Sequence, residues 1–181
     1  TILPALVVLM PAVSSIENIQ KCEDIVNIAI TNYPEYSKTV LVNYLLGIIN
    51  QKKQNFAEAK KYFEIVYNLE SDIFENQIAY ANSLRENANY SKAEEVLSTV
   101  EELNQNKVEV LKQKAYLAFE QNQLDLAESY VAKVLQNNPG DLDFVLFRAK
   151  ILIEKKDYIR AVSLLDMYER QNDNNIDYLI L

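Results

Sequence analysis

The sequence predicts an all-α protein made of about five antiparallel helix hairpins stacked in a row. Two observations predict this fold class. Glycine and proline together account for only six of the 181 residues, which disfavours turn-dense sandwiches, barrels and glycine-rich phosphate loops. The second observation is an internal repeat of 34 residues, a period typical of helical arrays. An apolar fraction of 49% supplies enough residues for a sizeable core.

The repeat consists of columns of small and apolar residues that recur every 34 positions. Two columns of small residues stand twelve positions apart, and three columns of larger apolar residues keep the same step. The small columns are Gly47, Ala81, Ala115, Ala149 and Ala59, Ala93, Ala127, Ala161. The apolar columns are Phe56, Tyr90, Leu124, Tyr158, then Phe63, Leu97, Val131, Leu165, then Val66, Val100, Val134, Tyr168.

Each copy predicts two helices joined by a short polar turn. In the first copy, residues 40–50 and 56–69 both have the apolar period of a helix. Because Ala59, Phe63 and Val66 recur at steps of three and four, they share one face, which we expect to be buried. The four turns are predicted at residues 53–55, 87–89, 121–123 and 155–157.

Two further features bear on how the helices pack and end. Gly47 and Ala59 are small, which would let the paired helices approach closely. Pro139 and Gly140 predict a firm helix stop, with the glycine in the left-handed conformation that often follows a helix.

These residues resemble the tetratricopeptide repeat, a 34-residue unit with a small residue at position 8, Ala at 20, an apolar residue at 24 and often Pro at 32. Counted from Val40, the first unit has Gly47 at position 8, Ala59 at 20 and Phe63 at 24, and Pro139 is at position 32 of the third unit. The resemblance implies a right-handed superhelical solenoid. The sequence departs from the pattern at position 4, with Asn43, Gln77, Leu111 and Val145, and at position 7, with Lys114 and Arg148.

The predicted organisation is five hairpins and the start of another unit. The units are residues 40–73, 74–107, 108–141 and 142–175, preceded by a degenerate hairpin at 1–39 and followed by a truncated unit at 176–181. A solenoid normally closes with a polar capping helix, and none is visible after residue 175. We therefore expect this chain to be a fragment of a longer array.

The first hairpin fits the repeat less well than the others. If Pro34 takes position 32, Cys22, Val26 and Ala29 take positions 20, 24 and 27, and the link at 35–39 is longer than usual. Cys22 is then a packing residue. Residues 14–17, Ser-Ser-Ile-Glu, predict a capping box for the helix that follows.

An apolar run at residues 2–13 precedes that helix and allows more than one interpretation. Pro11 would interrupt a helix there. Twelve residues are too few to span a membrane, and no basic region comes before them as in a secretory signal. A buried helix of the divergent hairpin is the preferred interpretation, and a hydrophobic contact surface or a remnant of a targeting segment are the alternatives.

Composition excludes most catalytic classes. With no histidine and one cysteine, the chain cannot form a Ser-His-Asp or Cys-His pair, an internal disulfide or a zinc site with imidazole ligands. Adjacent acids such as Glu94 and Glu95 diverge on a helix and cannot converge on one substrate atom. We expect no enzyme activity, no catalytic or metal residues, no cofactor and no small-molecule substrate.

The net charge of −8 disfavours nucleic acid and anionic lipid as partners. It also disfavours the pentatricopeptide repeat, a related RNA-reading hairpin whose period is 35. A membrane partner is not expected. No targeting signal is visible, and a single cysteine is compatible with any compartment. Cytoplasmic and bacterial periplasmic locations therefore both stay open.

Family resemblance implies that positions 2, 5, 9, 12 and 13 of each first helix line a concave groove that binds a segment of a protein partner. The residues predicted to form this partner-binding groove are Tyr44, Ile48, Asn82, Arg85, Lys112, Tyr116, Phe119 and Lys150. Aromatic rings would pack on apolar anchors, Asn82 would pair with backbone, and the cations would meet carboxylates. A two-carboxylate clamp for chaperone tails does not fit, since Ile78 replaces the lysine expected at position 5.

A structural role is the alternative to groove binding. In that case the chain is a spacer or oligomerisation module, self-associating through its open ends. The larger assembly could then be a bacterial envelope, secretion or polysaccharide complex, since the Asn, Ile, Lys and Tyr bias of the sequence suggests an AT-rich, bacterial genome.

Overall fold

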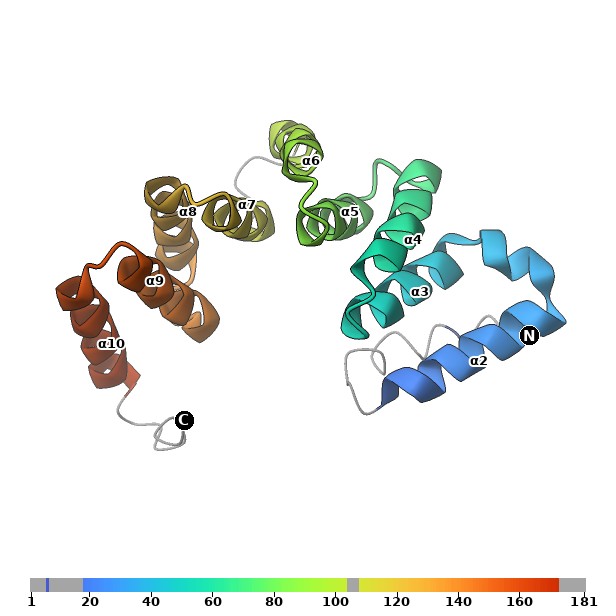
Figure 1. The fold of residues 1–181 in the computed structure, drawn as a ribbon, viewed down its shortest axis with the longest axis horizontal. Coiled ribbons are helices and arrows are strands. Elements are labelled where there is room, and N and C mark those ends of the chain that lie inside the picture. Colours follow the sequence, from blue (N-terminus) through green and yellow to red (C-terminus); the bar gives the residue numbers. More distant parts are fainter. Residues whose placement is uncertain (1–5, 7–17, 104–107, 173–181) are drawn as a thin grey trace. The chain divides into compact units, whose positions relative to one another are not determined.

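The computed structural model describes Leu6 and residues 18–103 and 108–172 (Figure 1). Every regular element in this part of the chain is helical. The chain divides into two compact units, Thr1–Val100 and Glu101–Leu181. The predicted capping box, most of the apolar run at 2–13 and the predicted truncated unit at 176–181 lie outside the described residues.

The first unit is a series of helices in which each packs on a chain neighbour. The helix α2 packs on α3, α3 packs on α4, and α4 packs on α5. The bounds are α2 (Ile19–Asn32), the 3-10 helix η2 (Pro34–Lys38), α3 (Val40–Lys52), α4 (Phe56–Leu69), α5 (Phe74–Glu86) and α6 (Tyr90–Leu103), whose last turn extends past Val100.

The second unit repeats the arrangement with two further hairpins. The helix α7 packs on α8, α8 on α9, and α9 on α10. The bounds are α7 (Val108–Glu120), α8 (Leu124–Asn137), α9 (Leu142–Glu154) and α10 (Tyr158–Asn172). The fold is therefore the predicted all-α helical repeat, and the 34-residue unit boundaries stay a prediction.

Small residues of the repeat lie where paired helices meet. Ala59, Ala93 and Ala127 are fully buried, and so is Ala115. A Cβ placed on Gly47 would lie 2.7 Å from Cε1 of Phe63, so glycine is required for the contact between α3 and α4. The spacing of small residues in the sequence therefore corresponds to the helix contact, as expected.

The last helix differs from its counterparts because its apolar column is exposed. Phe63, Leu97 and Val131 are at most 2% exposed, whereas Leu165, the fourth member of that column, is 37% exposed. Ile159 on the same helix is 82% exposed. The helix α10 thus exposes Leu165, whose counterparts in the earlier second helices are buried, together with Ile159.

Four turns between paired helices share a left-handed residue. The turns occupy the predicted positions, and φ is positive at Gln54, Ala88, Asn122 and Lys156, which lie 34 residues apart. Both described glycines have ordinary φ values, so the prediction of a left-handed Gly140 is wrong. The link from Asn138 to Asp141 closes through an Asp141 N–H to Asn138 carbonyl bond of 3.2 Å, which needs no left-handed residue.

Replacing Ala88 by glycine should stabilise the protein. Ala88 has a φ of 55°, a conformation in which Cβ crowds the following carbonyl and which costs about 1–2 kcal/mol for a non-glycine residue. Since glycine also raises the entropy of the unfolded chain, we expect Ala88→Gly to raise the unfolding free energy by about 0.5–1 kcal/mol. Urea denaturation followed by circular dichroism measures the change. The control is Ala57→Gly on the exposed face of α4, which should cost about 1 kcal/mol, and a loss of stability in both variants would contradict the explanation.

Polar residues at position 4 anchor the links that precede two helices. The Asn43 amide donates to the carbonyl of Ser37 at 2.8 Å, and the Gln77 amide donates to the carbonyl of Ser71 at 2.7 Å. Both side chains are buried, and both bonds reach back six residues. Side-chain amides thus satisfy link carbonyls at a position where the family pattern has an aromatic residue.

The described part of the first hairpin agrees with its predicted register. Cys22, Val26 and Ala29 are buried on one face of α2, and burial raises the pKa of the Cys22 thiol. The longer link predicted at 35–39 largely forms η2, which begins at Pro34 and ends before the Thr39 cap of α3. Cys22 is a core residue, as expected from its spacing.

Candidate partner-binding surface

The eight predicted groove residues all lie on first helices of hairpins. Four belong to the first unit and four to the second. Tyr44, Ile48, Asn82 and Arg85 lie on α3 and α5, and Lys112, Tyr116, Phe119 and Lys150 lie on α7 and α9. Lys150 is exposed, and the other seven are half-buried.

In the first unit, the predicted polar residues Asn82 and Arg85, both on α5, belong to a hydrogen-bond network that reaches α3. The Gln51 amide donates to both carboxylate oxygens of Glu86 at 2.9 Å. Arg85 Nη2 donates to the Asn82 Oδ1 at 2.5 Å, and the Asn82 amide donates weakly to Glu86 Oε1 at 3.4 Å. Asn82 and Arg85, predicted to meet a partner's backbone and carboxylates, are therefore engaged within the unit.

Tyr44 and Ile48 extend the core of the first unit. The Tyr44 ring meets the buried Phe63 ring edge-on at 5.7 Å between centroids, and Ile48 packs against the core cluster of α2 and α3. Burial, together with the negative charge of Glu75, raises the pKa of the Tyr44 hydroxyl. These two side chains support the helix pair from its edge.

In the second unit, α7 and α9 meet through a layer of aromatic rings. Phe147 lies at the centre, with centroid distances of 4.7 Å to Tyr116, 5.3 Å to Phe119 and 5.8 Å to Phe144. Tyr116 also meets Phe144 edge-on at 5.4 Å. Ring pairs at these distances and angles are favourable beyond the area that they bury, so the layer fixes the two helices against each other.

Lys112 is engaged within this unit. Its Nζ donates to Oδ2 of Asp141 at 2.7 Å and lies 4.8 Å from the centroid of the Phe144 ring. The hydrogen bond to Asp141 raises the pKa of Lys112, and burial opposes the shift. Asp141 also caps α9 by accepting the Phe144 N–H. Lys112 therefore stabilises the start of α9 through Asp141, and its ammonium group is already paired with a carboxylate of the same unit.

The exposed side of α9 combines a cation with large apolar side chains. Leu146 and Ile153 are 43% and 49% exposed, and Lys150 lies between them with its Nζ 5.0 Å from the centroid of the Phe119 ring. Steps of four and three residues put these three side chains on one helical face. We call Phe119, Leu146, Phe147, Lys150 and Ile153 the α7–α9 face.

Phe147 is a member of this surface that was not among the predicted groove residues. It lies at position 6 of its unit, outside the family's groove positions, and its role depends on the ring neighbours that α7 supplies. The signal in the sequence was the density of aromatic residues at Tyr116, Phe119, Phe144 and Phe147 on two helices that the repeat places side by side.

A network of charges ties α8, α9 and α10 together at Glu128. The carboxylate accepts from Lys155 Nζ at 2.7 Å and from Arg160 Nη1 at 3.0 Å, and Arg148 Nη2 lies 3.5 Å away. Burial alone would raise the pKa of Glu128, but the hydrogen bond and charge of Lys155, with the charges of both arginines, lower it below its ordinary value. The carboxylate is thus held ionised.

Removal of this carboxylate should weaken the protein in a pH-dependent way. Because the folded-state pKa of Glu128 lies below 4.5, its stabilisation is fully present above that pH and is lost as the pH falls through the lowered value. We expect Glu128→Gln to cost about 1–3 kcal/mol at neutral pH, and the difference from wild type to shrink as the pH falls below 4.5.

Urea denaturation at a series of pH values measures this difference. The control is Glu94→Gln on the exposed side of α6, which should leave stability within about 0.5 kcal/mol at each pH. A Glu128→Gln effect that is constant over the series would contradict the role of its charge.

Two other kinds of site are absent from the described residues. No group of three or more Cys, Asp or Glu side chains in this part of the chain is placed to hold a metal ion. Within the same residues, no helix is both long enough and apolar enough to cross a membrane.

Fold and surface together define a class: an all-α helical repeat protein whose candidate site is a helix face of aromatic, aliphatic and basic side chains. Three models of the tetratricopeptide repeat match residues 41–72, 78–141 and 118–181. The chain therefore belongs to the tetratricopeptide repeat family. Proteins of this family act generally as protein–protein interaction scaffolds and are generally not enzymes. No curated protein sequence matches the chain significantly.

Solved structures agree with this family. A tetratricopeptide repeat protein from Parabacteroides merdae is 14% identical with a TM-score of 0.73, over 83% of this chain and 58% of its own length. PilF of Pseudomonas aeruginosa is 16% identical with a TM-score of 0.70, over 92% of this chain and 75% of its own. YrrB, described as a TPR protein with an unusual peptide-binding site, is 21% identical with a TM-score of 0.58, over 92% and 84%. At these identities the likeness shows the fold.

Proposed function

We propose that this protein is a scaffold that binds a segment of a partner protein on the α7–α9 face. The observation that carries the proposal is the pair of exposed apolar side chains, Leu146 and Ile153, on either side of Lys150. Exposed apolar side chains grouped beside a cation suit a segment that combines an apolar anchor with a carboxylate. Aromatic and apolar anchors are where binding energy usually concentrates.

The ring layer beneath this face favours binding because it already orders the side chains that a partner would contact. Phe119 and Phe147 are held by ring contacts within the unit, and Lys150 rests on Phe119. A surface that is ordered before binding loses less side-chain entropy when the partner arrives. In the first unit, by contrast, Asn82 and Glu86 already bond to each other and to their neighbours.

Peptide or protein is the class of partner that the family favours. YrrB, which shares the fold at 21% identity, is described as having a peptide-binding site. The acidic net charge of −8 makes a locally basic position such as Lys150 the more suitable point for a carboxylate.

Cross-linking and affinity capture from native lysate, with the cross-linked peptides mapped by mass spectrometry, tests the proposal. The test variant is Leu146→Ser/Lys150→Glu, which changes two exposed side chains. A Lys112→Glu/Tyr116→Ala variant would be less informative, since it removes the Asp141 ion pair and two ring contacts. We expect the wild-type protein to yield a partner that is cross-linked to α7 or α9 and is lost in the test variant.

The matched control is Leu126→Ser/Lys133→Glu on α8. Leu126 is 43% exposed, like Leu146, and Lys133 lies 5.7 Å from the Tyr130 ring centroid, much as Lys150 lies over Phe119. The control should retain the partner. Capture that survives in the test variant, or is lost equally in both, would refute the assignment to the α7–α9 face.

A second candidate function is self-association through α10. The exposed apolar side chains of this helix include Ile159 and Val162, at positions where the earlier second helices carry alanine or polar residues. A second copy of the chain is the occupant that we propose, because a contact between this helix face and another part of the same protein can join successive copies.

Sedimentation velocity over a range of protein concentrations tests self-association. We expect wild type to form a larger species as concentration rises, and Ile159→Glu/Val162→Lys to stay monomeric. Concentration-independent monomer in wild type would rule out this second function and leave the first unaffected.

A further inference from the structure

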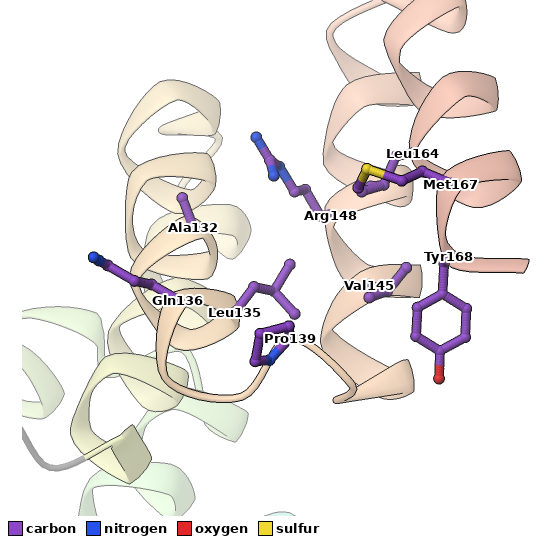
Figure 2. Close-up of a pocket in the computed structure, with 9 residues that line it drawn as sticks. All are labelled: Ala132, Leu135, Gln136, Pro139, Val145, Arg148, Leu164, Met167 and Tyr168. Atoms are coloured by element: carbon purple, nitrogen blue, oxygen red, sulfur yellow. The ribbon is translucent and has the colours of Figure 1, made fainter. Parts of the chain in front are cut away.

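A pocket lies in unit 2, on the opposite side of α9 from the α7–α9 face. It has a volume of about 280 Å³ and lies among α8, α9 and α10. Figure 2 shows Leu135 and Pro139 on one side of it, Val145, Leu164 and Met167 on the other, and Arg148 reaching from α9 toward α8 across one end. We call it the Arg148 pocket.

Comparison with the first unit explains why there is space here. Tyr67 and Tyr80 occupy the corresponding positions two repeats earlier, and their rings stack at 4.8 Å between centroids. In the second unit these positions hold Leu135 and Arg148, and no aromatic ring of the described residues replaces the pair among the lining side chains except Tyr168 at one edge. The pocket therefore lies beside the positions that two stacked aromatic rings occupy two repeats earlier in the same chain.

Arg148 adds to the lining of the pocket a hydrogen-bond donor that is unpaired within the described part of the chain. Its Nε is buried and has no hydrogen-bond partner among the described residues. Its one ion-pair contact in that part of the chain is the long 3.5 Å approach to Glu128. Glu128 already accepts closer bonds from Lys155 and Arg160, so a positive charge stays available beside the pocket. A buried donor without an acceptor favours a ligand that supplies one.

We propose that the Arg148 pocket binds a protein segment that inserts one aromatic side chain and places a neighbouring carboxylate on Arg148. The ring would contact Leu135, Val145 and Met167, where the exposed thioether of Met167 adapts readily to an aromatic edge. The carboxylate would accept from the guanidinium. This acidic–aromatic segment is distinct from the one proposed for the α7–α9 face, and neither proposal depends on the other.

Methyl NMR of the full chain tests the proposal. The probes are the peptide Ac-Ala-Glu-Tyr-Glu-Ala-NH2, the same peptide with Leu for Tyr, and the same peptide with Gln for both Glu residues. We expect the first peptide to shift the methyl signals of Leu164 and Met167 with saturation, and both altered peptides to bind about tenfold more weakly. N-acetyl-tyrosine should also bind more weakly than the first peptide.

Substitutions in the protein locate the site. Leu135→Tyr should weaken the first peptide about tenfold by filling the pocket, whereas Leu126→Tyr, the same change at an exposed position of α8, should not. Arg148→Met should abolish the preference for Glu over Gln peptides and keep the preference for Tyr over Leu. Circular dichroism confirms that each variant is folded.

Four results would overturn the inference. The absence of any saturable shift would exclude the pocket as a binding site, and equal binding by Leu135→Tyr would place binding elsewhere. Equal affinity for the Leu and Tyr peptides would exclude aromatic selection. Equal affinity for N-acetyl-tyrosine and the peptide would indicate a small aromatic ligand instead of a protein segment.

Discussion

Gly47→Leu should be the most disruptive single substitution in the first unit. A Cβ at this position would lie 2.7–2.9 Å from three ring atoms of Phe63, and Phe63 is itself buried and held edge-on by Tyr44. Because leucine is a better helix former than glycine, any loss comes from overpacking at the contact between α3 and α4. We expect a loss of about 3 kcal/mol in unfolding free energy, measured by urea denaturation.

Gly140→Leu is the matched control. The same side chain would extend from an exposed link, where a Cβ added to the glycine would meet only the Asn138 Oδ1 at 3.9 Å, so stability should change by less than about 0.5 kcal/mol. Phe63→Ala added to Gly47→Leu should recover part of the loss, since the two changes act on one contact. Equal effects at Gly47 and Gly140, or strict additivity with Phe63→Ala, would contradict this account.

Phe144→Ala should be the most disruptive substitution in the second unit. The side chain is 2% exposed, packs in the core cluster of α7 to α9, and meets the rings of Tyr116 and Phe147 and the Lys112 ammonium. Removing the ring leaves a cavity and deletes these contacts, so we expect a loss of about 3–5 kcal/mol.

Leu146→Ala, two residues along the same helix, is the control for Phe144→Ala. Leu146 is 43% exposed, and its truncation should cost less than about 0.5 kcal/mol while weakening partner binding on the α7–α9 face. Thermal unfolding by circular dichroism separates the two variants. A Phe144→Ala protein with the stability of Leu146→Ala would show that the ring layer does not hold α7 and α9 together.

The sequence predicted the helices and turns well because their signals are local and repeated. All four turns between paired helices lie at the predicted residues. The same holds for the buried register of Cys22, Val26 and Ala29 in α2. Periodicity of apolar residues fixes a helical face, and 34-residue repetition averages out irregularities in any one copy.

Turn conformation and polar contacts were less predictable. The sequence suggested a left-handed Gly140, yet the left-handed residues are Gln54, Ala88, Asn122 and Lys156. The hairpin geometry imposes positive φ on whichever residue occupies that turn position. The buried amides of Asn43 and Gln77 likewise looked like departures from the repeat, and their role depends on the link carbonyls that folding brings within reach.

What the sequence by itself determined is the all-α repeat, its family, its small-residue helix contacts and the general role of an interaction scaffold, because each follows from spacing along the chain. The tertiary structure decided which of the predicted groove residues stay available to a partner. Asn82, Arg85 and Lys112 direct their polar groups to neighbouring side chains of the same unit, whereas Lys150 stays exposed over Phe119. A side chain's position on a helix face follows from its number, but its partners depend on which residues the packed helices bring to it.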